Sequence, residues 1–138
     1  MERQRIRKIL VPLDGSKNSL KSLQVAINLA KEHEATLYAI HVVHTFPEKE
    51  RKRKEAEEDI PPSFILLAKK LAVKNEIPFH SRILSGDPGH AIIEYTETHS
   101  IDLIVIGARG LSAFKKIFLG SVSSYVIHKA KVAVMLIK

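Results

Sequence analysis

Three glycines and a serine in the last third of the chain lie between a predicted strand and a predicted helix, a position that suits phosphate binding. They are Gly107, Gly110, Gly120 and Ser121, with nine residues between the second and third glycines. They lie between an apolar run at residues 103–106, which predicts a buried strand, and residues 122–129, which predict a helix. A helix N-terminus offers free backbone N–H groups and a positive dipole end, which suit a phosphate. Glycine at such a turn lets the backbone approach a ligand closely or adopt positive φ.

The spacing of these four residues resembles the nucleotide-binding signature of the universal stress protein family, G-x2-G-x9-G-S/T, in its ATP-binding subgroup. Four other segments are similar to that family: Ile9–Ser16, Ala39–Val43, Gly86–Pro88 and Val132–Ile137. The similarity covers nearly the whole chain outside a charged segment at residues 48–59. It implies that the protein binds ATP, with Mg²⁺, as a nucleotide-dependent regulatory module of the stress response.

The resemblance implies a nucleotide site of ten residues. They are Pro12, Asp14, Val42, Gly107, Arg109, Gly110, Gly120, Ser121, Val122 and Ser123. At the phosphate end, the first two glycines of the signature would let the backbone pass close to ribose and phosphate. The backbone N–H groups of residues 120–123 can surround a phosphate, and the hydroxyls of Ser121 and Ser123 can add hydrogen bonds. The alternative is that the glycines are ordinary turn residues and a plain N-cap.

The remaining site residues are expected to contact adenosine or phosphates. Asp14 follows the first predicted strand, and the resemblance places it beside the adenosine, although a turn or capping aspartate is the alternative. Val42 matches a family position that contacts adenine, and a plain core valine is equally compatible with the sequence. Pro12 is expected to line the same pocket. Arg109 either reaches the phosphates or is an exposed loop arginine. Asp14 is also the acid expected near Mg²⁺, which usually keeps several waters.

Strand and helix patterns alternate along the chain. Apolar runs predict strands at residues 7–13, 37–43, 79–84, 103–106 and 132–137. Helices are predicted after Ser16, after Ser63, from Pro88 to about His99 and over residues 122–129, with Ser16 and Asp87 as N-caps. This alternation predicts an α/β fold, a three-layer α/β/α sandwich around an open, five-stranded parallel sheet. The resemblance adds the strand order 3-2-1-4-5 of Rossmann-like, adenine-nucleotide alpha-hydrolase-type folds, which would bring Asp14 next to Gly107.

Length and composition fit one domain over residues 1–138. The chain has no cysteine, and no apolar run approaches the ~18 residues of a membrane helix. The N-terminus lacks the apolar core of a signal peptide, so a cytoplasmic protein is expected. Residues 103–138 hold one arginine and five lysines but no acid, so they would attract a polyanion. Nucleic acid is the less favoured polyanion, because aromatic and basic residues do not interleave.

Residues 44–62 predict a charged surface insertion between the second strand and the second helix. Eleven of the twelve residues from Glu48 to Asp59 are charged, six acidic and five basic. Opposite charges recur four residues apart, which is compatible with a solvated helix that lacks an apolar face. The segment is interpreted as a surface insertion, or alternatively as an arm that docks a partner.

Other chemistries find little support in the sequence. The P-loop pattern with its lysine is absent, and the seven histidines form no recognised zinc spacing. An enzyme is therefore not favoured. The alternatives to a regulatory binding module are a slow ATPase or phosphotransferase on the same fold and a nucleotide-free interaction protein. The last strand is short, apolar and expected at the sheet edge, which predicts a homodimer formed through it. An unidentified regulatory protein is the other expected partner.

Overall fold

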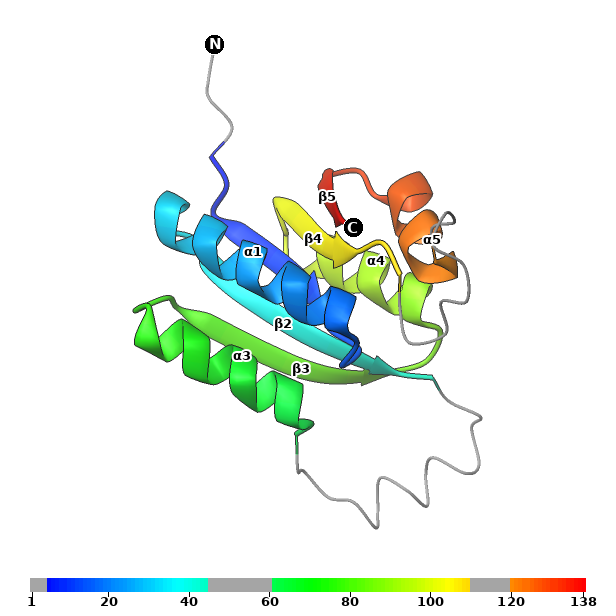
Figure 1. The fold of residues 1–138 in the computed structure, drawn as a ribbon. Helices are drawn as coiled ribbons and strands as arrows, with labels where there is room; N and C mark the ends of the chain where they lie inside the picture. The colour runs from blue at the N-terminus through cyan, green and yellow to red at the C-terminus, as the bar shows by residue number, and fades with distance from the viewer. Residues whose placement is uncertain (1–4, 45–60, 110–119) are drawn as a thin grey trace.

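In the computed structural model, which describes residues 5–44, 61–109 and 120–138, the chain forms a parallel sheet with helices on both faces (Figure 1). The strands within these ranges are β1 (Lys8–Pro12), β2 (Thr36–Val43), β3 (Phe79–Ser85), β4 (Leu103–Gly107) and β5 (Ala133–Ile137). They pair in the order β3-β2-β1-β4-β5, and all neighbours are parallel. The predicted parallel sheet and its strand order are confirmed.

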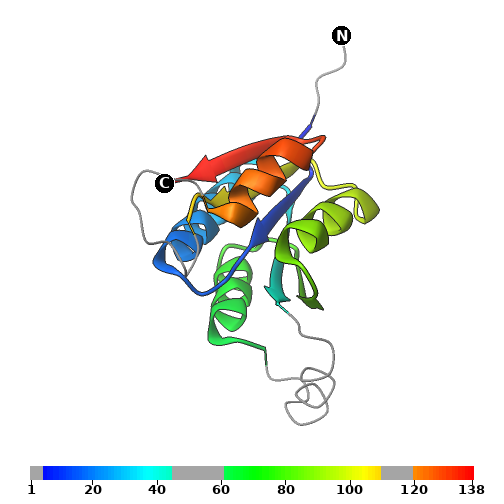
Figure 2. The same cartoon turned by 90° about the vertical axis from the view of Figure 1, so that its right-hand side faces the viewer.

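The helices in the described part of the chain are α1 (Lys17–His33), α3 (Ser63–Lys74), α4 (Pro88–Thr98) and α5 (Ser121–Lys129). α1 and α3 pack on one face of the sheet, and α4 and α5 pack on the other, so the molecule has three layers (Figure 2). α5 begins one residue before the predicted start. The reason is that Gly120 takes the N-cap position, with extended φ and ψ of −65° and 156°.

β1 lies at the centre of the core because both of its faces are covered. Ile9 and Val11 pack with α1 and α3, whereas Leu10 packs with α4 and α5. All three side chains are fully buried, as expected for a strand inside a parallel sheet. β3 lies at the sheet edge and is largely exposed, which agrees with its mixed polar and apolar sequence.

α1 and α4 begin with the predicted side-chain caps. The hydroxyl of Ser16 precedes α1 and accepts a hydrogen bond from the Ser19 N–H at 3.1 Å. The carboxylate of Asp87 precedes α4 and accepts from the His90 N–H at 3.0 Å, and Pro88 opens the helix. Each cap directly follows a strand or its turn, so it determines where the helix leaves the sheet.

Some sequence predictions fall outside the described residues. Residues 45–60 of the predicted insertion lie there, as do Gly110 and the spacer at residues 111–119. The single domain over residues 1–138 and the partner-docking arm therefore stay predictions. Across residues 5–44, 61–109 and 120–138, no helix is both long and apolar enough to cross a bilayer. A cytoplasmic location also stays a prediction.

Replacing Ser16 with alanine removes the cap of α1, and we expect the free energy of unfolding to fall by about 1 kcal/mol. Ser63→Ala is the matched control, because it changes an exposed serine at the start of α3, a helix without a side-chain cap. This control should leave the free energy of unfolding unchanged. Denaturant unfolding followed by circular dichroism measures both variants. Equal losses in the two would contradict the capping role.

Candidate functional site

A cavity of about 340 Å³ opens where β1, β2 and β4 end at the carboxyl edge of the sheet. β1 and β4 are neighbours there, at the point where the strand order reverses. Nine of the ten predicted site residues line this cavity: Pro12, Asp14, Val42, Gly107, Arg109, Gly120, Ser121, Val122 and Ser123. The tenth, Gly110, lies outside the described residues. The fold thus brings together residues from both ends of the chain, and Asp14 and Gly107 share one cavity as expected.

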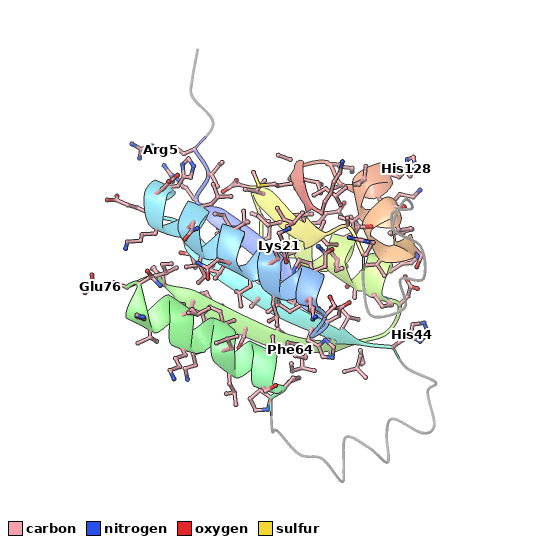
Figure 3. All side chains as sticks on the ribbon, in the orientation of Figure 1. Arg5, Lys21, His44, Phe64, Glu76 and His128 are labelled. Atoms are coloured by element: carbon pink, nitrogen blue, oxygen red, sulfur yellow. The ribbon has the colours of Figure 1, made fainter. Side chains whose placement is uncertain are left out.

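Sequence reasoning missed six further residues of the cavity. They are Leu13, Ser19, His44, Pro88, Ile92 and Ile106. Leu13 and His44 directly follow strands, so their position after an apolar run could have predicted them. Figure 3 labels His44 at the end of β2. Pro88 and Ile92 come from α4, and no sequence signal shows that this helix reaches the cavity. Most of the additions are apolar, so the cavity combines apolar sides with a few polar groups.

Asp14 both forms a turn and lines the cavity. One of its carboxylate oxygens accepts a hydrogen bond from the Ser16 N–H at 2.9 Å, which closes the turn between β1 and α1. The Ser19 hydroxyl lies 3.4 Å from the Asp14 N–H and donates to the Ser16 carbonyl at 3.0 Å. The turn and the ligand interpretations of Asp14 are therefore compatible with one another.

The N-terminus of α5 opens into the cavity without a side-chain cap. Gly120 is the N-cap residue, and the first helical hydrogen bond runs from the Ser124 N–H to the Gly120 carbonyl at 3.0 Å. The N–H groups of residues 121–123 precede that bond and have no acceptor within the helix. The Gly120 N–H, expected to contact phosphate, instead donates to the Ala108 carbonyl at 2.7 Å. The N–H groups at this helix end that have no acceptor within the helix are therefore those of residues 121–123.

The hydroxyl of Ser123 also has a different role from the predicted one. The Ser123 side chain is buried, and its hydroxyl donates to the Ala108 carbonyl at 2.8 Å, with the Gly120 carbonyl also near, at 3.0 Å. Its hydrogen atom is therefore used within the protein, where it ties together the two described ends of the loop after β4. Ser121 is exposed, and its hydroxyl contact with phosphate stays a prediction.

Gly107 lies against a residue that the sequence reasoning missed. A Cβ atom at Gly107 would be 2.6 Å from the side-chain oxygen of Asn18, on α1. That oxygen accepts a hydrogen bond from the Arg109 N–H at 2.8 Å. Neither Gly107 nor Gly120 has a positive φ. A left-handed backbone conformation is therefore not the reason for glycine at either position.

Two charged side chains, Asp14 and Arg109, line the described cavity, and both are half-buried. Within the described ranges, no group of three or more histidines and carboxylates is arranged to hold a metal ion.

A second cavity, of about 450 Å³, lies between β3 and α4. Its polar lining includes Arg82, Glu94, Tyr95, Thr98 and His99. Burial raises the pKa of Tyr95, the neighbouring Tyr38 raises it further, and the positive charge of Arg82 opposes the shift. The Tyr95 phenol is thus neutral at physiological pH. None of the nine predicted site residues that the structure describes lines this cavity, so the first cavity is the candidate site.

Comparisons with known proteins agree with this fold. The model of the universal stress protein family matches residues 5–138. A universal stress protein of Methanocaldococcus jannaschii is 35% identical, over 96% of this chain and 82% of its own length. Universal stress protein UspA from Lactobacillus plantarum has a similar structure, with a TM-score of 0.81, 28% identity and coverage of 99% of this chain and 100% of that one.

A further solved structure is the universal stress protein from Archaeoglobus fulgidus in complex with dAMP. Its TM-score is 0.72, and it covers 96% of this chain and 98% of its own. Its sequence is 24% identical, so the likeness concerns the fold.

Replacing Ser123 with alanine should lower the free energy of unfolding by about 1 kcal/mol, because a buried hydrogen bond to the Ala108 carbonyl is lost. Ser121→Ala, two residues earlier on the same helix, changes an exposed side chain and should have no measurable effect on stability. Denaturant unfolding of both variants tests this difference. A larger loss in Ser121→Ala than in Ser123→Ala would show that the two roles are wrongly assigned.

Proposed function

Because the chain belongs to the universal stress protein family, we propose that it binds an adenine nucleotide, ATP together with Mg²⁺, and acts as a regulatory module in a stress response. One observation carries this proposal. The uncapped N-terminus of α5 opens into the same cavity as the apolar side chains at the ends of β1, β2 and β4. A nucleotide needs both features, an apolar environment for its base and anion-binding groups for its phosphates.

In this proposal the apolar side chains contact the base, and the hydrogen-bond donors bind the phosphates. Val42, Ile92 and Ile106 supply the apolar surface for the adenine ring. The N–H groups of residues 121–123, the Ser121 hydroxyl and the Arg109 side chain bind the phosphates. Asp14, near the end of β1, is available to the ribose. The solved relative in complex with dAMP supports an adenine nucleotide at the level of the shared fold.

Mg²⁺ would accompany the phosphates in this proposal. The cation supplies positive charge that partly neutralises the phosphates when it is bound. Asp14 is the carboxylate of the described cavity that could hold it, directly or through water. A hard cation with oxygen ligands fits this donor set, because the other ligands would be phosphate oxygens and waters.

Binding is a better proposal than catalysis. Hydrolysis or transfer of the terminal phosphate requires a group that orients or deprotonates the attacking oxygen. Asp14 is the carboxylate lining the cavity in the described part of the chain, and one of its oxygens already accepts the Ser16 N–H. Regulation then requires that the nucleotide favours one of two states that a partner protein distinguishes.

Ser121→Asp tests the phosphate end of the site. The new carboxylate would repel phosphate, so the affinity for ATP should fall by about tenfold or more, whereas the affinity for uncharged adenosine should not change. The stability of the protein should not fall, because a negative charge at a helix N-terminus is favourable by about 0.3–1 kcal/mol. Isothermal titration with Mg-ATP and with adenosine measures both affinities.

Ser121→Asn is the control for this substitution, because it has nearly the same shape without the charge. Its affinity for ATP should stay within about threefold of the wild-type value. Undiminished ATP binding by Ser121→Asp would place the phosphates elsewhere. Wild-type protein that binds no adenine nucleotide would overturn the proposed function itself.

We also propose that two copies of the chain pair through β5. Within the described residues β5 pairs only with β4, all its residues are apolar, and Met135 is 37% exposed. An apolar edge strand with unpaired backbone groups favours pairing with another strand. A second copy related by two-fold symmetry would offer the same strand and cover both edges at once.

Met135→Glu should weaken this dimer, because it places like charges on a strand that the two copies would share. The wild type should have twice the chain mass of 15.5 kDa at micromolar concentration, and the variant should be largely monomeric. Val73→Glu, at an apolar side chain on α3 that is 67% exposed, is the control and should stay dimeric. Light scattering after size-exclusion chromatography gives the masses. A monomeric wild type would rule out the dimer.

A further inference from the structure

We infer that Asn18 is a positioning residue that holds the backbone at Gly107–Arg109, and that position 107 is a glycine because Asn18 occupies the space of a side chain there. The inference deepens the proposed function, on which its consequence for nucleotide affinity rests. In this inference the first glycine of the signature, Gly107, leaves room for a side chain of helix α1. Glycine at this position would then serve the ligand indirectly, through the shape of the loop.

Both ends of the Asn18 amide have a backbone partner. The side-chain oxygen accepts from the Arg109 N–H at 2.8 Å, and the side-chain nitrogen donates to the Ile137 carbonyl at 3.0 Å. The opposite orientation of the amide would face a donor with a donor and an acceptor with an acceptor. One side chain on α1 thus connects the loop after β4 with the end of β5, more than 90 residues away along the chain.

The contact with Gly107 leaves no room for a side chain. A Cβ atom there would be 2.6 Å from the Asn18 oxygen, 3.1 Å from its Cγ and 3.3 Å from its backbone carbonyl carbon. The φ of Gly107 is not positive, so other residues could adopt its backbone conformation. Space is therefore the constraint. The Asn18 oxygen could move away from a Cβ only by giving up the Arg109 N–H.

The same junction is braced by neighbouring contacts. The Ile137 carbonyl also accepts from the Ala108 N–H at 2.8 Å, and Gly107 is the register partner of Ile137. One turn further along α1, the Lys21 ammonium donates to the Lys138 carbonyl at 2.8 Å; Figure 3 labels Lys21 on α1. Gly107 and Arg109 line the cavity, whereas Asn18 does not, so Asn18 acts on a ligand through the loop backbone.

A double-mutant cycle tests the contact without any nucleotide. Gly107→Ala alone should raise the equilibrium constant for unfolding by about tenfold or more, because the methyl group displaces the Asn18 amide. In the Asn18→Ala background the same change should raise that constant less than about threefold, since the obstructing side-chain atoms are gone and only the backbone contact at 3.3 Å stays. Additive effects would overturn the inference. If Gly107→Ala does not fold, recovery of folded protein in the double variant supports it, and no recovery contradicts it.

Asn18→Ala tests the effect on the loop and the ligand. Hydrogen exchange of the Arg109 amide should accelerate by about tenfold or more, and the Kd for Mg-ATP should rise by about tenfold. Asn28→Ala, an exposed asparagine on the same helix, should change neither. Unchanged exchange and Kd in Asn18→Ala would overturn the positioning role. If the wild type binds no nucleotide, the proposed function fails, while the exchange rate and the double-mutant cycle still decide whether Asn18 positions the loop.

Discussion

The parallel pairing of β1 with β2 on one side and with β4 on the other is the constraint from which the site follows. The helix that follows β1 covers one face of the sheet, and the helix that follows β4 covers the other. The two connections therefore diverge above the carboxyl ends of neighbouring strands, and a crevice opens between them. The buried side chains of Ile9, Leu10 and Val11 hold this arrangement in place by packing with both helical layers.

Some backbone groups around the crevice form hydrogen bonds within the protein, whereas others lie at the open end of α5 beside the cavity. The Ala108 carbonyl accepts from the Gly120 N–H and from the Ser123 hydroxyl, which brings together the two described ends of the loop after β4. The next N–H groups, at residues 121–123, are left at the open end of α5. An anion there would satisfy donors that have no acceptor within the helix, so loop closure and the proposed anion binding would be separate tasks of adjacent residues.

α1 connects the proposed nucleotide site to the proposed dimer strand. Its cap, Ser16, shares a turn with Asp14, and its second residue, Asn18, bonds to the loop at Arg109 and to β5 at Ile137. A ligand that shifts the loop would therefore act on the end of β5 through the Asn18 amide and through the Ala108 N–H, which both donate to the Ile137 carbonyl. This arrangement gives a physical route by which occupancy of the cavity and the surface of the edge strand can influence each other.

The sequence by itself predicted the alternating strands and helices, the side-chain caps of α1 and α4, and nine of the residues that line the cavity. Apolar runs and caps such as Ser16 and Asp87 are local signals, because strand burial and helix initiation depend on neighbouring residues. Only the tertiary structure decided what each polar group faces. The Gly120 N–H and the Ser123 hydroxyl bond to Ala108, and Asn18 fills the space beside Gly107. These partners lie on other elements or across the loop. Local sequence patterns do not reveal such contacts, because they depend on how the strands and helices pack together.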